Sequence, residues 1–156
     1  MSVTPKSVSI ASGLPWERPL SGHVIICHLC VATISWSPSL LDSTKWDRVQ
    51  THYLRRVHGK SQQQVEKDLG KMFLVEVEEG VEIANCITQK ATSKTMSRTA
   101  VYQSFEYVAK ASARIEGDVS IHVLAHKPAA EVKMLEAKGF GAFGRRGISC
   151  TLYTNK

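Results

Sequence analysis

Two cysteines and two histidines have the spacing of ligands for one metal ion. Cys27 and Cys30 form a C-x2-C pair, and His52 and His58 form an H-x5-H pair that follows residues 31–51. Two thiolates and two imidazoles can surround a tetrahedral zinc ion, with Zn–S distances of about 2.3 Å and Zn–N distances of about 2.0 Å. The four side chains are therefore predicted to hold one structural zinc ion.

The histidine pair is carried by a predicted helix that starts near Asp42 or Ser43 and stops at Gly59. Its apolar residues recur at helical spacing, at Trp46, Val49, Tyr53 and Val57. So small a unit lacks a sufficient core, and zinc would stabilise it by on the order of 10 kcal/mol. The alternative treats the cysteines as buried apolar residues and the histidines as unrelated surface groups. His28, between the cysteines, is interpreted as a solvent-facing turn residue.

Residues 22–60 resemble a Cys2His2 zinc finger, and the helix end THYLRRVH at residues 51–58 is most similar to a BED-type finger. The insert between the ligand pairs is longer than in the standard DNA-reading finger, so no base-reading positions are assigned. Basic side chains on a finger helix would meet phosphates, and here they are Lys45, Arg48, Arg55 and Arg56. An ordinary solvated helix face is the alternative.

The second half of the chain is predicted to be a two-layer α/β domain with the order ββαβαβ. Alternating apolar residues predict strands, and helical spacing predicts helices, at residues 72–78, 81–87, 101–115, 119–123, 129–138 and 148–153. Helices would cover one face of the sheet. Gly139 is expected to end the last helix, and Phe140 and Phe143 are expected in the core.

The predicted fold class is thus α+β, with a zinc-finger module before the two-layer domain. The expected parts are a flexible N-terminal arm (1–21), the zinc-finger module (22–60), a linker or helix extension (61–71) and the α/β domain (72–156). The longest apolar run, residues 24–27, is far shorter than the roughly 20 residues that cross a bilayer. No secretory signal or disulfide pattern is visible. We expect an intracellular protein of a reducing compartment, nuclear or cytoplasmic, without a membrane partner.

Charge favours an anionic partner. The 156 residues include 20 Lys and Arg against 14 Asp and Glu, a net charge of +6. Lys90 and Lys94 lie in a loop rich in Ser and Thr, and Arg145 and Arg146 follow a Gly-rich run with two aromatic residues. These four residues are also predicted to contact phosphates of DNA or RNA.

Residues 83–154 resemble two families. The order of strand, basic loop, helix, strand, helix and strand is similar to the Alba-type nucleic-acid-binding fold. That resemblance implies a dimer that grips DNA or RNA with Lys90 and Lys94 in a loop and Arg145 and Arg146 on an arm. Residues 119–140 also resemble the end of a GNAT acetyltransferase, in which a Gly-rich turn binds the coenzyme A pyrophosphate. Residues 93–99, where that turn would lie, contain no glycine.

The leading prediction is a zinc-containing nucleic-acid-binding protein that is not an enzyme and that contacts phosphates with both halves of the chain. Two alternatives remain open. One is a compact GNAT-like acyl-CoA-dependent acetyltransferase with an accessory zinc finger. The other is a structural subunit of a ribonucleoprotein assembly, and a homodimer is compatible with the leading prediction.

Overall fold

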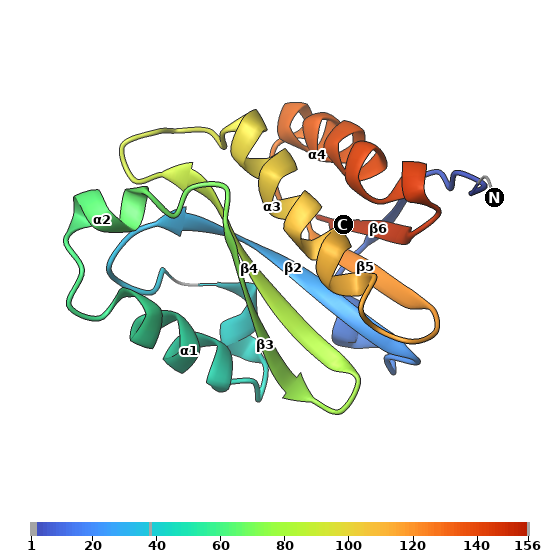
Figure 1. Ribbon diagram of the computed structural model, residues 1–156, viewed down its shortest axis with the longest axis horizontal. Coiled ribbons are helices and arrows are strands. Elements are labelled where there is room, and N and C mark those ends of the chain that lie inside the picture. Colours follow the sequence, from blue (N-terminus) through green and yellow to red (C-terminus); the bar gives the residue numbers. More distant parts are fainter. Residues whose placement is uncertain (1–2, 38, 156) are drawn as a thin grey trace.

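A six-stranded mixed sheet forms the centre of the protein in the computed structural model, which describes residues 3–37 and 39–155 (Figure 1). The strands are β1 (Ser9–Ser12), β2 (His23–Ala32), β3 (Met72–Glu78), β4 (Val81–Lys90), β5 (Val119–Leu124) and β6 (Ser149–Thr154). Their order in the sheet is β1-β6-β5-β2-β4-β3. Five of these strands run parallel, and β3 pairs antiparallel with β4 at one edge.

Helices cover both faces of this sheet. The helices are α1 (Arg48–Val57), α2 (Gln62–Glu66), α3 (Arg98–Ser112) and α4 (Ala129–Ala142), with 3-10 turns η1 (Pro15–Glu17), η2 (Leu40–Ser43) and η3 (Gly144–Arg146). Helices α3 and α4 lie on one face, and α1 lies on the other (Figure 1). The two helices predicted in the second half, α3 and α4, do share one face, but α1 covers the other face of the same sheet. The fold is therefore a mixed α/β domain of three layers and not of two.

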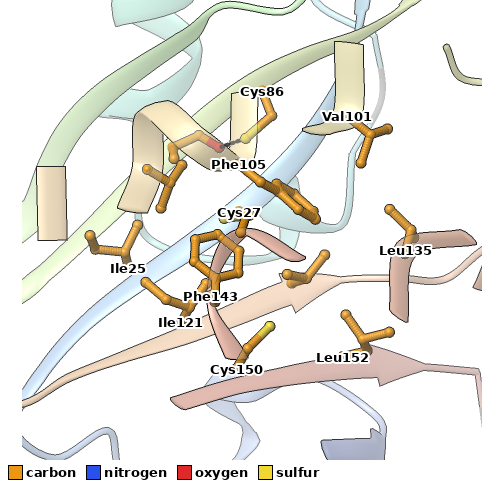
Figure 2. Close-up of a cluster of buried hydrophobic side chains, with 14 of the residues drawn as sticks. Ile25, Cys27, Cys86, Val101, Phe105, Ile121, Leu135, Phe143, Cys150 and Leu152 are labelled. Carbon is orange, nitrogen blue, oxygen red and sulfur yellow. Dashed lines mark hydrogen bonds between the residues drawn. The ribbon is translucent and has the colours of Figure 1, made fainter. Parts of the chain in front are cut away.

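The burial of β2 explains the third layer. Val24, Ile25, Ile26 and Cys27 are each at most 1% exposed, although successive side chains of a strand point to opposite faces. A continuous apolar run of this kind is typical of a central parallel strand that is covered on both sides. Ile25 and Cys27 pack with the aromatic rings of α3 and the α4 end (Figure 2). Val24 and Ile26 pack toward α1.

The residues of the expected zinc-finger module do not form a separate domain in this fold. Strand β2 pairs with β4 and β5 in the middle of the sheet, and α1 packs on that sheet as an outer layer. The expected boundaries at residues 60/61 and 71/72 therefore do not separate two cores. Within the expected N-terminal arm, β1 pairs in parallel with β6. Residues 1–2 of that arm lie outside the described residues.

Two local predictions also need correction. The helix expected near Asp42 is divided into η2 and α1, which begins at Arg48. Helix α4 does not stop at Gly139 but continues to Ala142. A β-carbon at Gly139 would lie 3.6 Å from the Cys150 sulfur, an ordinary van der Waals distance, so the packing on the sheet does not require glycine here. None of the described helices is long and apolar enough to span a membrane.

The connections between strands locate a switch point in the sheet. Strands β2 and β5 are parallel neighbours, but the chain leaves β2 toward the face with α1 and leaves β5 toward the face with α4. In open α/β sheets, ligands bind outside the carboxyl ends of strands at such a reversal. The carboxyl ends of β2 and β5 are therefore the place in this fold where a binding site is expected.

Candidate functional site

A pocket of about 150 Å³ opens where β2 and β5 end. Its wall contains His28 of β2, Ser35 and Trp36 of the following loop, Tyr53 of α1, and Lys127 from the turn after β5. The pocket thus joins both loops that diverge at the switch point. It is smaller than a drug-sized ligand, so it can enclose one moiety of a larger molecule.

Aromatic side chains shape the pocket, and hydrogen bonds hold them. The Trp36 ring centroid lies 5.4 Å from that of His28 and 5.6 Å from that of Tyr53. The indole N–H of Trp36 donates to Asp42 Oδ1 at 2.9 Å, and the hydroxyl of Tyr53 donates to the carbonyl of Thr33. These bonds fix the loop after β2, so the wall is formed before any ligand enters.

A chain of polar side chains lies at the base of this loop. Nε2 of His28 is 2.7 Å from Oγ of Ser39, and Nδ1 of His28 is 2.9 Å from Oδ1 of the fully buried Asn85 on β4. Burial lowers the pKa of His28 below its ordinary value of 6.5, and this effect outweighs the hydrogen bond to Asn85. Lys127 also lowers the pKa by repulsion. The imidazole is therefore neutral at pH 7.

Positive charge is concentrated on the same edge of the sheet. Lys127 immediately precedes Pro128, the N-cap of α4, and the first N–H groups of a helix have no acceptor within the helix. Lys90 ends β4, and Lys94 and Arg98 follow it. Cationic side chains beside a helix N-terminus favour anionic ligand groups.

Two larger hollows of about 620 Å³ each lie away from the switch point. One lies between residues 11–21 and the His122 and Tyr153 side chains. The other is near Lys110 and Arg146, toward the amino ends of β5 and β6. We therefore take the smaller pocket at the carboxyl edge as the candidate site.

The predicted zinc ligands do not converge. Cys27 packs in the core on the α3 and α4 side of the sheet, whereas Cys30 packs on the opposite side with Tyr53 of α1. His52 is half-buried on α1, and His58 is exposed at its C-cap. No group of three or more potential His, Cys, Asp or Glu ligands occurs within residues 3–37 and 39–155. The zinc-finger prediction is wrong because the C-x2-C pair lies in an extended strand, where residues three apart face opposite ways.

The basic residues predicted around the finger helix serve several different contacts. Lys45 lies 3.9 Å from a carboxylate oxygen of Glu78, and Arg48 donates to the carbonyl of Glu76 at 3.1 Å. The guanidinium of Arg56 lies 4.3 Å from the centroid of the Phe73 ring. Arg55 is exposed on α1. Three of these four residues thus bind the edge strand β3.

The remaining predicted phosphate contacts lie at opposite edges of the sheet. Lys90 and Lys94 follow the carboxyl end of β4, whereas Arg145 and Arg146 precede the amino end of β6. Because these strands run in the same direction, the two pairs are separated by the length of the sheet. Arg146 also pairs with Glu106 at 2.7 Å. The two pairs therefore do not form the joint surface that the sequence suggested.

The structure brings together residues that were not predicted to act together. His28 lies in β2 with both ring nitrogens engaged, not in a turn facing solvent. Ser39, Asn85 and Lys127 are separated by long stretches of chain and match no local motif. Only the position of Lys127 in the sequence could have marked it as a candidate. It follows a strand with alternating apolar residues and precedes a helix that starts with Pro128.

Comparison with protein-family models and with curated proteins finds no match. Comparison with solved structures finds matches over nearly the whole chain. A macrodomain protein from Streptomyces coelicolor is 25% identical, with a TM-score of 0.77, over 94% of this chain and 98% of that chain. A Bacteroides thetaiotaomicron protein of unknown function is 22% identical, with a TM-score of 0.77, over 96% and 98%. The macrodomain of Mycobacterium tuberculosis DarG is 15% identical, with a TM-score of 0.63, over 94% and 98%.

These similarities cover nearly the whole chain and show a macrodomain fold. They replace the expected resemblances to a BED-type zinc finger, to the Alba fold and to a GNAT acetyltransferase. The prediction of a zinc-containing nucleic-acid-binding protein is accordingly wrong.

Proposed function

We propose that the protein binds ADP-ribose, free or attached to another molecule, at the carboxyl ends of β2 and β5. Proteins with a macrodomain fold typically bind or hydrolyse ADP-ribose. The observation that carries the proposal is the pocket at the switch point, which joins the aromatic side chain of Trp36 to the cation of Lys127. An aromatic wall beside a positive charge suits a ligand with flat or sugar rings and phosphates.

Each part of the site has a role in this proposal. The rings of Trp36 and Tyr53 would hold one ring system of the ligand, since the pocket of about 150 Å³ admits one such group. Lys127 and the N-terminus of α4 would hold the diphosphate. The rest of the ligand would extend toward Lys94 and Arg98 in the loop and helix start after β4.

The two loops around the pocket contain no glycine, at residues 33–47 and 125–128. Close approach of the backbone to a phosphate is easiest at glycine. Side-chain cations would therefore carry more of the phosphate binding than in a Gly-rich loop, and the affinity should fall as salt is added.

Isothermal titration calorimetry with ADP-ribose tests this proposal, with ADP and ribose 5-phosphate as partial ligands. We expect ADP-ribose to bind more tightly than either fragment. Replacing Lys127 by Ala should weaken binding by about tenfold, which corresponds to about 1.4 kcal/mol. Lys133→Ala is the matched control, because Lys133 is an exposed lysine on the adjoining helix α4.

Two results would reject the proposal. One is the absence of binding heat and of thermal stabilisation at millimolar ADP-ribose. The other is an equal loss of affinity in the Lys127 and Lys133 variants, which would show a diffuse charge effect in place of a defined site. A ligand present at 100 times its Kd should stabilise the folded state by about 2.7 kcal/mol, which a thermal melt detects readily.

A further inference from the structure

Three polar side chains from separate parts of the chain form a hydrogen-bonded series at the carboxyl edge of the sheet. Ser39 Oγ lies 2.7 Å from His28 Nε2, and His28 Nδ1 lies 2.9 Å from Asn85 Oδ1. The order hydroxyl, imidazole, side-chain carbonyl is that of nucleophile, base and orienting group in acyl-transfer enzymes. The series belongs to β2, the loop after it, and β4.

The side-chain carbonyl of Asn85 favours a proton on Nδ1 of His28. Asn85 Oδ1 lies 2.9 Å from Nδ1 and 3.6 Å from the Cys30 sulfur, which is itself 3.3 Å from Nδ1. With the proton on Nδ1, the lone pair of Nε2 faces the Ser39 hydroxyl. Burial keeps the imidazole neutral by lowering the pKa of His28. The imidazole is thus ready to accept the hydroxyl proton.

Ser39 is held in place but is not enclosed. Its backbone N–H donates to Asp42 Oδ2 at 2.9 Å, and its Oγ accepts from the N–H of Leu41 at 3.1 Å. The residue as a whole is half-buried. Ser39 itself does not line the neighbouring pocket, but its hydrogen-bond partner His28 does. The apolar surface of Leu29, Trp36 and Tyr53 in that pocket suits a short acyl group.

From this geometry we propose that Ser39 is a nucleophile, with His28 as its general base and Asn85 as the positioning residue, for hydrolysis of small acyl esters. Ser39 Oγ attacks the ester carbonyl as its proton moves to His28 Nε2. The C–O bond to the alcohol then breaks, and the alcohol leaves with that proton. Water next attacks the acyl-serine ester, again through His28, and releases the carboxylic acid and the free hydroxyl.

This activity goes beyond nucleotide binding and does not depend on it. The site shares His28 with the proposed ADP-ribose pocket, but its test uses no nucleotide. A protein that fails to bind ADP-ribose but is acylated at Ser39 would refute the first proposal and support this one. A protein that binds ADP-ribose but is not acylated at Ser39 would support the first proposal and refute this one.

The first measurement uses a fluorophosphonate probe, which forms a phosphorus–oxygen bond to an activated serine and releases fluoride. We expect one adduct by intact mass spectrometry, located on Ser39 by peptide mapping. Ser43→Ala is the matched control, because Ser43 is an exposed serine of η2, the turn that Ser39 caps. Labelling should persist in this control and be lost in Ser39→Ala. Labelling of several serines, or of none, would overturn the proposal.

A second set of variants separates nucleophilic from structural roles. Ser39 also caps η2, so Ser39→Asp keeps an N-cap oxygen while removing the nucleophile. We expect this variant to melt within a few degrees of the wild type and to resist labelling. His28→Gln should slow both labelling and hydrolysis of p-nitrophenyl acetate by at least about 100-fold, the lower range for general-base catalysis. Unchanged rates in either variant would refute the assigned roles.

Asn85→Asp tests the positioning role by a pH profile. A carboxylate would also accept from Nδ1, and its charge would raise the pKa of His28. The labelling rate should therefore begin to fall at a higher pH in this variant than in the wild type. Asn85→Leu removes the acceptor and should lower the rate at every pH. A pH profile that is identical in the wild type and Asn85→Asp would refute the role of Asn85.

Discussion

Cys27 and Cys30 lie three residues apart in β2 and point to opposite faces of the sheet. Cys27 lies among Phe105 and Phe143 (Figure 2). Cys30 lies against Tyr53 on the side of α1. A hydrogen bond with Cys86 and burial raise the pKa of Cys27, and burial raises the pKa of Cys30. Neither thiol is available as a thiolate to a metal ion or a reagent at neutral pH.

Removal of metal should therefore leave the protein unchanged. We expect a chelator to shift neither the thermal midpoint nor the circular dichroism spectrum, and elemental analysis to find far less than one zinc per chain. A thiol reagent such as DTNB should react with Cys27 and Cys30 only as the protein unfolds. Stoichiometric zinc that is lost in Cys30→Ser would contradict this prediction.

Stability should decrease on mild acidification. Burial lowers the pKa of His28, His52 and His122 below the ordinary value of 6.5, so the unfolded chain binds protons more tightly than the folded protein. The free energy of unfolding should fall as the pH drops below 6.5, by at most about 1.4 kcal/mol per pH unit for each histidine. Urea unfolding at pH 7.5 and 5.5 measures this change.

A substitution at His122 tests whether protonation of buried histidines causes the loss of stability at low pH. Its ring lies 5.2 Å from the Tyr153 ring, and its buried Nδ1 has no hydrogen-bond partner among the described residues. Phe at position 122 would keep the ring contact and remove the proton. We expect His122→Phe to lose less stability than the wild type between pH 7.5 and 5.5. An equal loss would assign the pH dependence to other groups.

Two nearby phenylalanines should differ sharply in their effect on stability. Phe143 is fully buried, with its ring centroid 5.2 Å from that of Phe105, whereas Phe140 is 39% exposed. Phe143→Ala should cost about 3–5 kcal/mol because it leaves a cavity in the core. Phe140→Ala should change the free energy of unfolding by about 0.5 kcal/mol or less. Chemical denaturation of both variants makes the comparison, and similar losses would contradict it.

Arg146 should contribute to stability through Glu106. Its guanidinium lies 2.7 Å from the Glu106 carboxylate and also donates to the carbonyl of Ala142 at 2.8 Å. Burial alone would raise the pKa of Glu106, but hydrogen bonds from Arg146 and Tyr102 lower it. Arg146→Ala should cost up to about 1 kcal/mol.

A double-mutant cycle with Glu106→Gln isolates the pair. The coupling should be about 0.5 kcal/mol or more at pH 7 and should fade below pH 4, as the lowered pKa of Glu106 is approached from above. Arg145→Ala is the control, since Arg145 is exposed beside it. A coupling of zero would show that the ion pair does not stabilise the fold.

Much of the secondary structure was readable from local patterns. The hairpin of β3 and β4, helix α3, strand β5, the start of α4 at Ala129 and strand β6 lie where periodicity predicted them. These elements obey periods of 2 and 3.6 residues that their own side chains display. Some predicted boundaries were wrong, as at Gly139, which was expected to end α4 but keeps a helical backbone inside it.

The candidate site could not be predicted from local sequence patterns in the same way. The C-x2-C spacing fits a zinc site only if the two cysteines lie on a turn, and the apolar run at residues 24–27 ends at the first of them. That run was the available clue, since four successive buried residues indicate a strand covered on both faces.

The amino-acid sequence by itself thus determined the period of each element, the excess of positive charge and the absence of glycine around the carboxyl-edge loops. Tertiary structure alone decided that β2 lies between β4 and β5, which places His28 beside Asn85 and close to Lys127. The physical reason is that parallel strand neighbours are chosen by long-range burial on two faces, and no local spacing records which strands will meet.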